Sequence, residues 1–106
     1  MKSSVSEKKF LRKKLYSLRM EEDGQIFEHL ENFNMLLTQL TSVEVPMDEE
    51  ERCQILLCSF LDSWDSLVMA IGSTSFVLKM EDVVGFLLYE EMRRKVSLNS
   101  KEALSV

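Results

Sequence analysis

The sequence predicts an all-α protein, a compact bundle of about five helices. Apolar side chains recur every three or four residues along most of the chain, and no segment shows the strict alternation of a strand. The 106 residues include three Gly and one Pro, too few for a turn-rich sandwich or barrel. No apolar run approaches the roughly 18 residues of a membrane span, and the start lacks the apolar core of a signal peptide. We therefore expect a soluble, cytoplasmic protein.

The first predicted element is a basic amphipathic helix that runs to about Met20 from an N-cap at Ser4 or Ser6. Its apolar stripe is Leu11, Leu15 and Leu18, with Phe10 and Tyr16 beside it. Its opposite face is basic and contains Lys8, Lys9, Arg12, Lys13 and Lys14. Residues 1–20 carry a net charge of +6 and residues 21–106 carry −11, so the overall charge of −5 conceals a basic arm on an acidic body.

The second predicted helix, about residues 25–41, has the clearest period in the chain. The residues that recur along one face are Ile26, Leu30, Phe33, Leu37 and Leu40. Phe27 and Leu36 broaden this face, and Asp23 is the predicted N-cap. We expect His29 to lie on the polar face, exposed to solvent.

Pro46 ends this pattern, and two shorter helices follow it. Asp48 is the predicted N-cap of the third helix, whose first turn carries three glutamates, as the helix dipole favours. Its apolar residues are Cys53, Ile55, Leu56, Leu57 and Phe60. Asp62 or Ser63 begins a fourth helix that ends at Gly72. The residues expected to face inward from it are Trp64, Leu67, Val68 and Ile71.

The last predicted helix covers about residues 80–95, with three basic residues in its last turn. Its apolar face contains Met80, Val83, Val84, Leu87, Leu88 and Met92. In the connector before it, we expect Phe76, Val77 and Leu78 to fill the core. Residues 97–106 show no strong period and are expected to be a frayed, flexible tail.

The inventory of reactive side chains argues against an enzyme. The sequence contains no phosphate-binding loop, no dinucleotide-binding motif and no zinc-protease motif. Two cysteines and one histidine are too few for a four-ligand zinc site within one copy. We interpret Cys53 and Cys58 as small buried hydrophobic residues. We therefore predict no catalytic residue, no metal or other cofactor, and no small-molecule substrate.

Two features of the sequence suggest binding. The basic face of the first helix suits phosphates of nucleic acid, an anionic membrane surface or a groove on a partner, although a solvated face explains it more simply. Met35, Phe86 and Tyr89 lie off the main apolar stripes, either as scattered exposed residues or as a contact between subunits. The candidate self-association residues are Leu11, Leu15, Leu18, Met35, Phe86 and Tyr89.

Several short segments follow one another in a consistent order over about residues 8–96. They are KLYSLRMEE at residues 14–22, EHL at 28–30 with Phe33, Asn34, Leu37, Gln39 and Leu40 after it, DEE at 48–50, LLCSF at 56–60, SWDSLV at 63–68, MEDVV at 80–84 and EEMRRK at 90–95. Together they resemble the Gag polypeptide of copia-type LTR retrotransposons.

This resemblance implies a helical capsid protein, similar to the C-terminal lobe of retroviral capsids, that associates with itself into a shell around RNA. The segment from 25 to 40 looks like a counterpart of the retroviral major homology region. The core residues implied for it are Gln25, Phe27, Glu28, Leu30, Phe33, Leu37 and Leu40. Residues 1–22 would then be a basic linker helix, residues 23–96 the capsid-like domain and residues 97–106 a flexible tail.

The sequence departs from the family pattern in two ways. Phe60-Leu61 stands where relatives usually carry Leu-Pro. The zinc knuckle that binds RNA in such proteins is not found, and neither is most of an N-terminal lobe. We therefore expect either a trimmed chain or a truncated, host-retained copy, and RNA packaging is not assigned to these residues.

Three functions follow as hypotheses. The first is self-association of Gag-type subunits into dimers or larger oligomers, including virus-like particles. The second is a co-opted adaptor that binds peptides or host proteins through a helical groove. The third is binding of nucleic acid or a membrane by the basic helix, for which affinity should fall steeply with salt.

Overall fold

The computed structural model describes residues 4–73 and 79–104, with side chains described as far as residue 98. In chain order its elements are α1 (Val5–Ser17), α2 (Ile26–Ser42), α3 (Glu49–Cys58), the 3-10 helix η1 (Asp62–Trp64), α4 (Asp65–Gly72) and α5 (Met80–Leu104). No strand occurs among the described residues. The predicted all-α class is confirmed.

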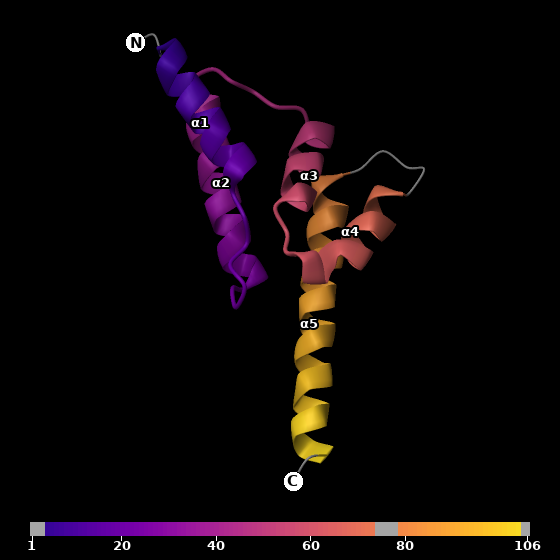
Figure 1. The fold of residues 1–106 in the computed structure, drawn as a ribbon. Helices are drawn as coiled ribbons and strands as arrows, with labels where there is room; N and C mark the ends of the chain where they lie inside the picture. The colour runs from indigo at the N-terminus through magenta and orange to yellow at the C-terminus, as the bar shows by residue number, and fades with distance from the viewer. Residues whose placement is uncertain (1–3, 74–78, 105–106) are drawn as a thin grey trace.

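The helices form two groups that pack against each other (Figure 1). Helices α1 and α2 lie side by side as an antiparallel hairpin, and α3, η1, α4 and the first part of α5 form the second group. Helix α5 then continues beyond both groups, and the molecule measures 61 × 31 × 19 Å along its principal axes. The long dimension therefore comes largely from α5.

Local sequence signals specify where two of the helices begin. The Ser4 hydroxyl accepts a hydrogen bond from the Glu7 backbone N–H at 3.1 Å, and the Asp48 carboxylate accepts one from the Glu51 N–H at 2.8 Å. Both side chains satisfy backbone donors that an α-helix leaves unpaired in its first turn. The predicted N-caps at Ser4 and Asp48 are confirmed.

The predicted N-cap of α2 is wrong. Helix α2 begins after Gln25 rather than after Asp23, and the Gln25 side chain makes no capping hydrogen bond. Instead, the Glu91 carboxylate of α5 accepts a hydrogen bond from the Ile26 N–H at 2.7 Å. The side chain of Glu91, which is remote in sequence, therefore caps α2 in place of a local N-cap residue.

One core joins all the helices, and most of the predicted apolar stripes contribute to it. The fully buried apolar side chains are Leu15, Ile26, Phe33, Leu40, Cys53, Leu56, Val83 and Leu87. Leu11 and Leu15 of α1 pack into the same core as α2 and α3, and Leu18 is partly buried against it. The leucine stripe of the first helix is therefore covered by its own chain.

Two predicted helix ends are wrong. Helix α1 ends at Ser17, because Leu18 turns to an extended conformation and the Met20 N–H donates to the Ser59 carbonyl at 2.8 Å. Helix α5 continues to Leu104, well past residue 95, so the expected frayed tail is helical over most of its length. Neither Gly nor Pro follows Gly85, so no helix-breaking residue stops α5.

Several side chains that we expected in the core are exposed. They are Phe27, Cys58, Leu88 and Met92. Each lies on a helix face that no described neighbour covers, since burial depends on where the other helices lie. The three connector residues expected to fill the core, Phe76 to Leu78, fall outside the described residues.

No single helix in the described part of the chain is both long and apolar enough to cross a membrane. The segments Glu49–Cys58 and Asp62–Gly72 meet the length and composition criteria only when joined, and the chain bends by 119° between them.

Candidate functional site

A buried polar contact joins the two helix groups. His29 Nε2 of α2 lies 2.6 Å from the Ser59 hydroxyl, which follows α3, and both residues are buried. The Ser59 hydroxyl donates its proton to the Leu56 carbonyl. A hydroxyl has one proton, so His29 Nε2 must carry the hydrogen and donate to Ser59.

Aromatic packing closes this contact from one side. The His29 and Phe60 rings meet edge to face with centroids 5.1 Å apart, and Phe60 lies 5.4 Å from the Trp64 ring. Burial lowers the pKa of His29 below its ordinary value of 6.5. The imidazole is therefore neutral near pH 7.

The predicted exposure of His29 is wrong, and the sequence held a signal against it. His29 lies three residues after Ile26 and four before Phe33, both fully buried, so all three share one face of α2. Leu30, which we placed on the apolar stripe, is only partly buried. The buried stripe is thus rotated slightly from the predicted one.

The pair of His29 and Ser59 is not arranged for nucleophilic catalysis. A serine nucleophile needs a base that accepts its proton, whereas here the histidine donates and the serine donates onward to a carbonyl. A pocket of about 180 Å³ opens beside His29, lined by the 18–25 segment and α2. The described residues contain no group of three or more His, Cys, Asp or Glu side chains placed to hold a metal ion.

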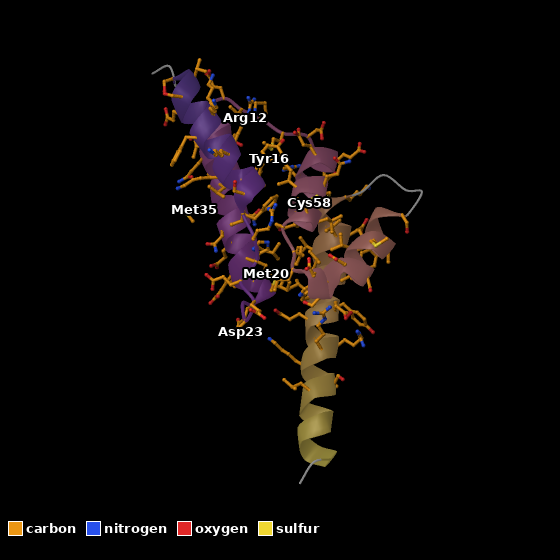
Figure 2. All side chains as sticks on the ribbon, viewed as in Figure 1. Arg12, Tyr16, Met20, Asp23, Met35 and Cys58 are labelled. Atoms are coloured by element: carbon orange, nitrogen blue, oxygen red, sulfur yellow. The ribbon has the colours of Figure 1, made fainter. Side chains whose placement is uncertain are left out.

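A further contact across the two groups joins α1 to α3. The Tyr16 hydroxyl donates to Glu51 at 3.0 Å, and this hydrogen bond raises the pKa of Tyr16. Tyr16 and Met20 both point from the hairpin segment toward α3 (Figure 2). Sequence reasoning did not identify these contacts, because each joins residues that are distant along the chain.

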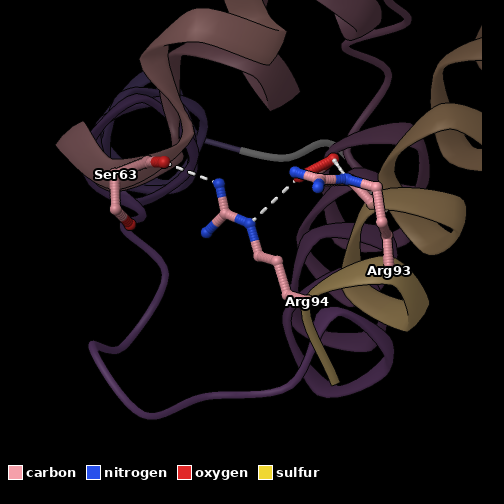
Figure 3. Close-up of polar contacts among 4 residues, drawn as sticks. Ser63, Arg93 and Arg94 are labelled. Atoms are coloured by element: carbon pink, nitrogen blue, oxygen red, sulfur yellow. Dashed lines mark hydrogen bonds and ion pairs between the residues drawn. The ribbon is translucent and has the colours of Figure 1, made fainter. Parts of the chain in front are cut away.

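Arg94 fixes α5 against η1 (Figure 3). Its guanidinium lies 4.0 Å from the centre of the Trp64 ring, donates to the Ser63 carbonyl at 2.6 Å and reaches Glu90 at 3.3 Å. Arg93 also donates to Glu90, and this hydrogen bond holds the pKa of that carboxyl below its usual range. We had assigned these arginines only to the helix dipole; Arg94 additionally orients the helix.

With its inner face held in this way, α5 leaves an apolar stripe exposed on the rest of its surface. We call Phe86, Tyr89, Met92 and Val96 the α5 outer stripe; each is between 51% and 66% exposed. On the inner face, Val83 and Leu87 are fully buried. A shallow pocket of about 250 Å³ lies on the stripe, lined by Tyr89, Met92, Arg93 and Val96. Exposed apolar patches of this kind typically mark interaction sites.

The predicted self-association residues separate into three sets. Leu11 and Leu15 are buried, and Leu18 is half-buried, so this stripe is not available to a second copy. Phe86 and Tyr89 lie together on the α5 outer stripe. Met35 is exposed on α2, where it points away from α3 (Figure 2).

The residues expected to form a core like the major homology region also separate. Phe33 and Leu40 are buried, and Leu30 and Leu37 are partly buried. The others, Gln25, Phe27 and Glu28, are exposed at the start of α2.

The basic residues of α1 lie outside the core. Lys9, Arg12, Lys13 and Lys14 are exposed and Lys8 is half-buried. Lys14 Nζ lies 5.0 Å from the centre of the Phe10 ring. The chain thus keeps a basic helix face at one end of the hairpin.

Comparison with known proteins gives two kinds of match. A family model described as the gag-polypeptide of LTR copia-type matches residues 1–100. The chain is 36% identical over 104 residues to the Retrovirus-related Pol polyprotein from transposon TNT 1-94 of Nicotiana tabacum, covering 98% of this chain and 8% of that protein. It is 35% identical over 57 residues to a probable prolyl 4-hydroxylase 11 of Arabidopsis thaliana, covering 54% of this chain and 21% of that protein. The chain therefore spans a small part of these relatives. No solved structure matches it.

Proposed function

The chain belongs to the gag-polypeptide family of copia-type LTR retrotransposons, and on that premise we propose that its copies associate with one another through the α5 outer stripe. The family gives the chain a Gag-derived structural role. Self-association, up to the assembly of particles, is the specific activity that we propose for it.

The observation that carries this proposal is the exposure of the α5 outer stripe. Single exposed apolar side chains are common on protein surfaces, but here four large ones lie close together on one helix. Tyr and Met are also enriched at the centres of interfaces. Covering one such side chain contributes about 1.5–3 kcal/mol, before the cost of association is subtracted. A modest contact of this size suits a subunit whose interactions are repeated by symmetry.

The test is a concentration series by sedimentation equilibrium, from about 1 μM to 1 mM, on the unmodified chain and on Tyr89→Asp. We expect the mass of the unmodified chain to rise toward that of a dimer or larger oligomer. Tyr89→Asp should remain monomeric up to a protein concentration at least about tenfold higher than the one at which the unmodified chain begins to associate. The reason is that burying an unpaired charge in the interface is strongly unfavourable.

Met35→Asp is the matched control, since Met35 is similarly exposed but lies on α2. It should associate like the unmodified chain. Circular dichroism of each variant confirms that the helices are intact. If the unmodified chain is still entirely monomeric at about 1 mM, the highest concentration of the series, the proposal is overturned.

The basic face of α1 supports a second candidate function, contact with nucleic acid. Lys9, Arg12 and Lys13 are exposed, and their charges suit phosphates. Affinity for single-stranded RNA should fall by at least about tenfold between 50 and 200 mM salt, and Arg12→Glu should weaken it. Binding without any dependence on salt contradicts this assignment.

A further inference from the structure

We infer that the α5 outer stripe is covered by α5 of a second copy, lying antiparallel to the first. This inference rests on the self-association proposed above and specifies its occupant and orientation. It follows from the spacing of the stripe, the charges at the two ends of the helix, and the position of Gly85.

The spacing of the stripe suits a partner helix. Tyr89, Met92 and Val96 of the stripe follow one another at steps of three and four residues, and Gly85, which is not one of its apolar residues, lies four residues before Tyr89. At about 100° per residue, this spacing places all four within a narrow strip that is opposite Val83 and Leu87. The same alternation of steps forms the seam between two helices in a coiled coil.

The charges along α5 decide between the two orientations. Glu81 and Asp82 are exposed in its first turn, whereas Arg93 and Lys95 are exposed several turns later. A parallel pair would place acid beside acid and base beside base. An antiparallel pair places the acidic end of each helix beside the basic part of the other, and does so twice because the pair is symmetric.

The arginine and lysine remain available for such a contact. Arg93 and Lys95 pair with Glu90 and Glu91 of their own helix, but 61% and 62% of their side-chain surfaces are still exposed. The two glutamates are largely covered. Each cation therefore has an open side that can meet an acidic residue of the second copy.

Gly85 fits a closely approaching helix. Glycine is among the poorest helix formers, yet Gly85 lies within α5 at the level of the stripe. A Cβ atom added there would meet no described atom within 4 Å, apart from its chain neighbours and the backbone of its own helix turn. Packing among the described residues of one copy thus gives no reason for a glycine at this position, whereas a second helix lying against it does.

Helix α5 also has the length for this contact. It continues beyond the two helix groups, so the later part of the stripe lies clear of them (Figure 1). Asp82 and Arg93 both lie toward the Phe86 side of the stripe, and in an antiparallel pair these sides of the two helices adjoin. Asp82 of each copy should therefore lie near Arg93 of the other.

A charge-reversal cycle tests the orientation. Asp82→Arg and Arg93→Asp, made singly, should each weaken the dimer at least about tenfold, because each places two pairs of like charges together. Asp82→Arg combined with Arg93→Asp should restore the dissociation constant to within about threefold of the unmodified chain. In a parallel pair, the combined variant would regain nothing.

A distance measurement on an otherwise intact helix provides an independent test. A spin label on Ser97→Cys in a Cys58→Ser background should give a separation of about 30 Å between the two copies, because the contact of Asp82 with Arg93 places the crossing midway between these residues and each residue beyond it adds 1.5 Å of rise. A parallel pair would bring the labels to within about 10–15 Å, and this distance overturns the inference.

The two proposals fail in different ways. A chain that stays monomeric at every concentration removes the proposed function and this inference together. A chain that associates, but with a short label separation or with no response to the charge cycle, keeps the proposed function and removes only the antiparallel α5 pair. If a charge variant loses its helical circular dichroism, the label distance alone decides.

Discussion

The Ile26 backbone N–H donates a hydrogen bond to the Glu91 carboxylate at 2.7 Å, across 65 residues of sequence. Ile26 is the first residue of α2, and Glu91 lies in the middle of α5. The carboxylate also lies at the N-terminal end of the α2 dipole, where negative charge is favourable. One side chain thus caps one helix and holds another against it.

Glu91→Ala should therefore lower the free energy of unfolding by about 1–2 kcal/mol, as expected for the loss of a capping side chain. Urea denaturation followed by circular dichroism measures it. Glu31→Ala, at an exposed position on α2, is the control and should change stability by less than about 0.5 kcal/mol. Equal effects of the two substitutions would show that Glu91 is not a cap.

Stability should fall as the pH drops below about 6.5, because of His29. Burial lowers the pKa of His29 from its ordinary 6.5, so in this range the unfolded chain binds a proton that the folded chain does not. The stabilising contribution of neutral His29 to the free energy of unfolding is therefore complete above about pH 6.5, and it is lost as the pH falls toward the lowered pKa of the folded chain.

The measurement is the urea midpoint at several pH values between 5 and 8. His29 is the one histidine of the chain, so His29→Gln should remove the slope between about pH 5 and 7. An unchanged slope in this variant would assign the pH dependence to another group.

Ser59→Ala should destabilise the fold by about 1–3 kcal/mol, because it leaves the buried His29 N–H without its acceptor. Ser66→Ala, at an exposed position on α4, is the control. The double variant Ser59→Ala/His29→Gln should lose less stability than the sum of the losses of the two single variants, because both single variants remove the same hydrogen bond. Strictly additive effects would contradict a direct hydrogen bond.

Glu44→Gly should raise stability by about 0.5–1 kcal/mol. Glu44 follows the end of α2 with φ of 64°, a left-handed conformation that costs most L-residues about 1 kcal/mol and that glycine adopts freely. Thermal unfolding measures the change. Glu44→Ala removes the same charge but keeps the strain, so it should bring no gain; a gain equal to that of glycine would point to charge rather than backbone conformation.

Much of the fold could be predicted because its signals are local. Ser4 and Asp48 cap the nearest helix turn, and the apolar period of α2 places Phe33 and Leu40 in the core. The order of short motifs along the chain also led to the correct family, which the family model and the tobacco polyprotein confirm.

The candidate site was predicted less completely. Phe86 and Tyr89 were identified because they break the apolar period of the last helix, and they do lie on the α5 outer stripe. Met92 was assigned to the core and instead belongs to that stripe, because it lies on the side of α5 opposite Val83 and Leu87, which the other helices cover. Periodicity shows that a helix has apolar positions, but it does not show which side of the helix its neighbours cover.

The sequence by itself determined the helices, two of their N-caps and the family. Only the tertiary structure decided that His29 is buried on Ser59, that Glu91 caps α2 and that Leu15 is covered by its own chain. Caps and helical periods arise between residues a few positions apart, whereas these three features depend on which helices meet. The contrast between +6 and −11 along the chain is likewise a property of the sequence, but the separation of acidic and basic residues along one exposed face of α5 depends on the folded helix.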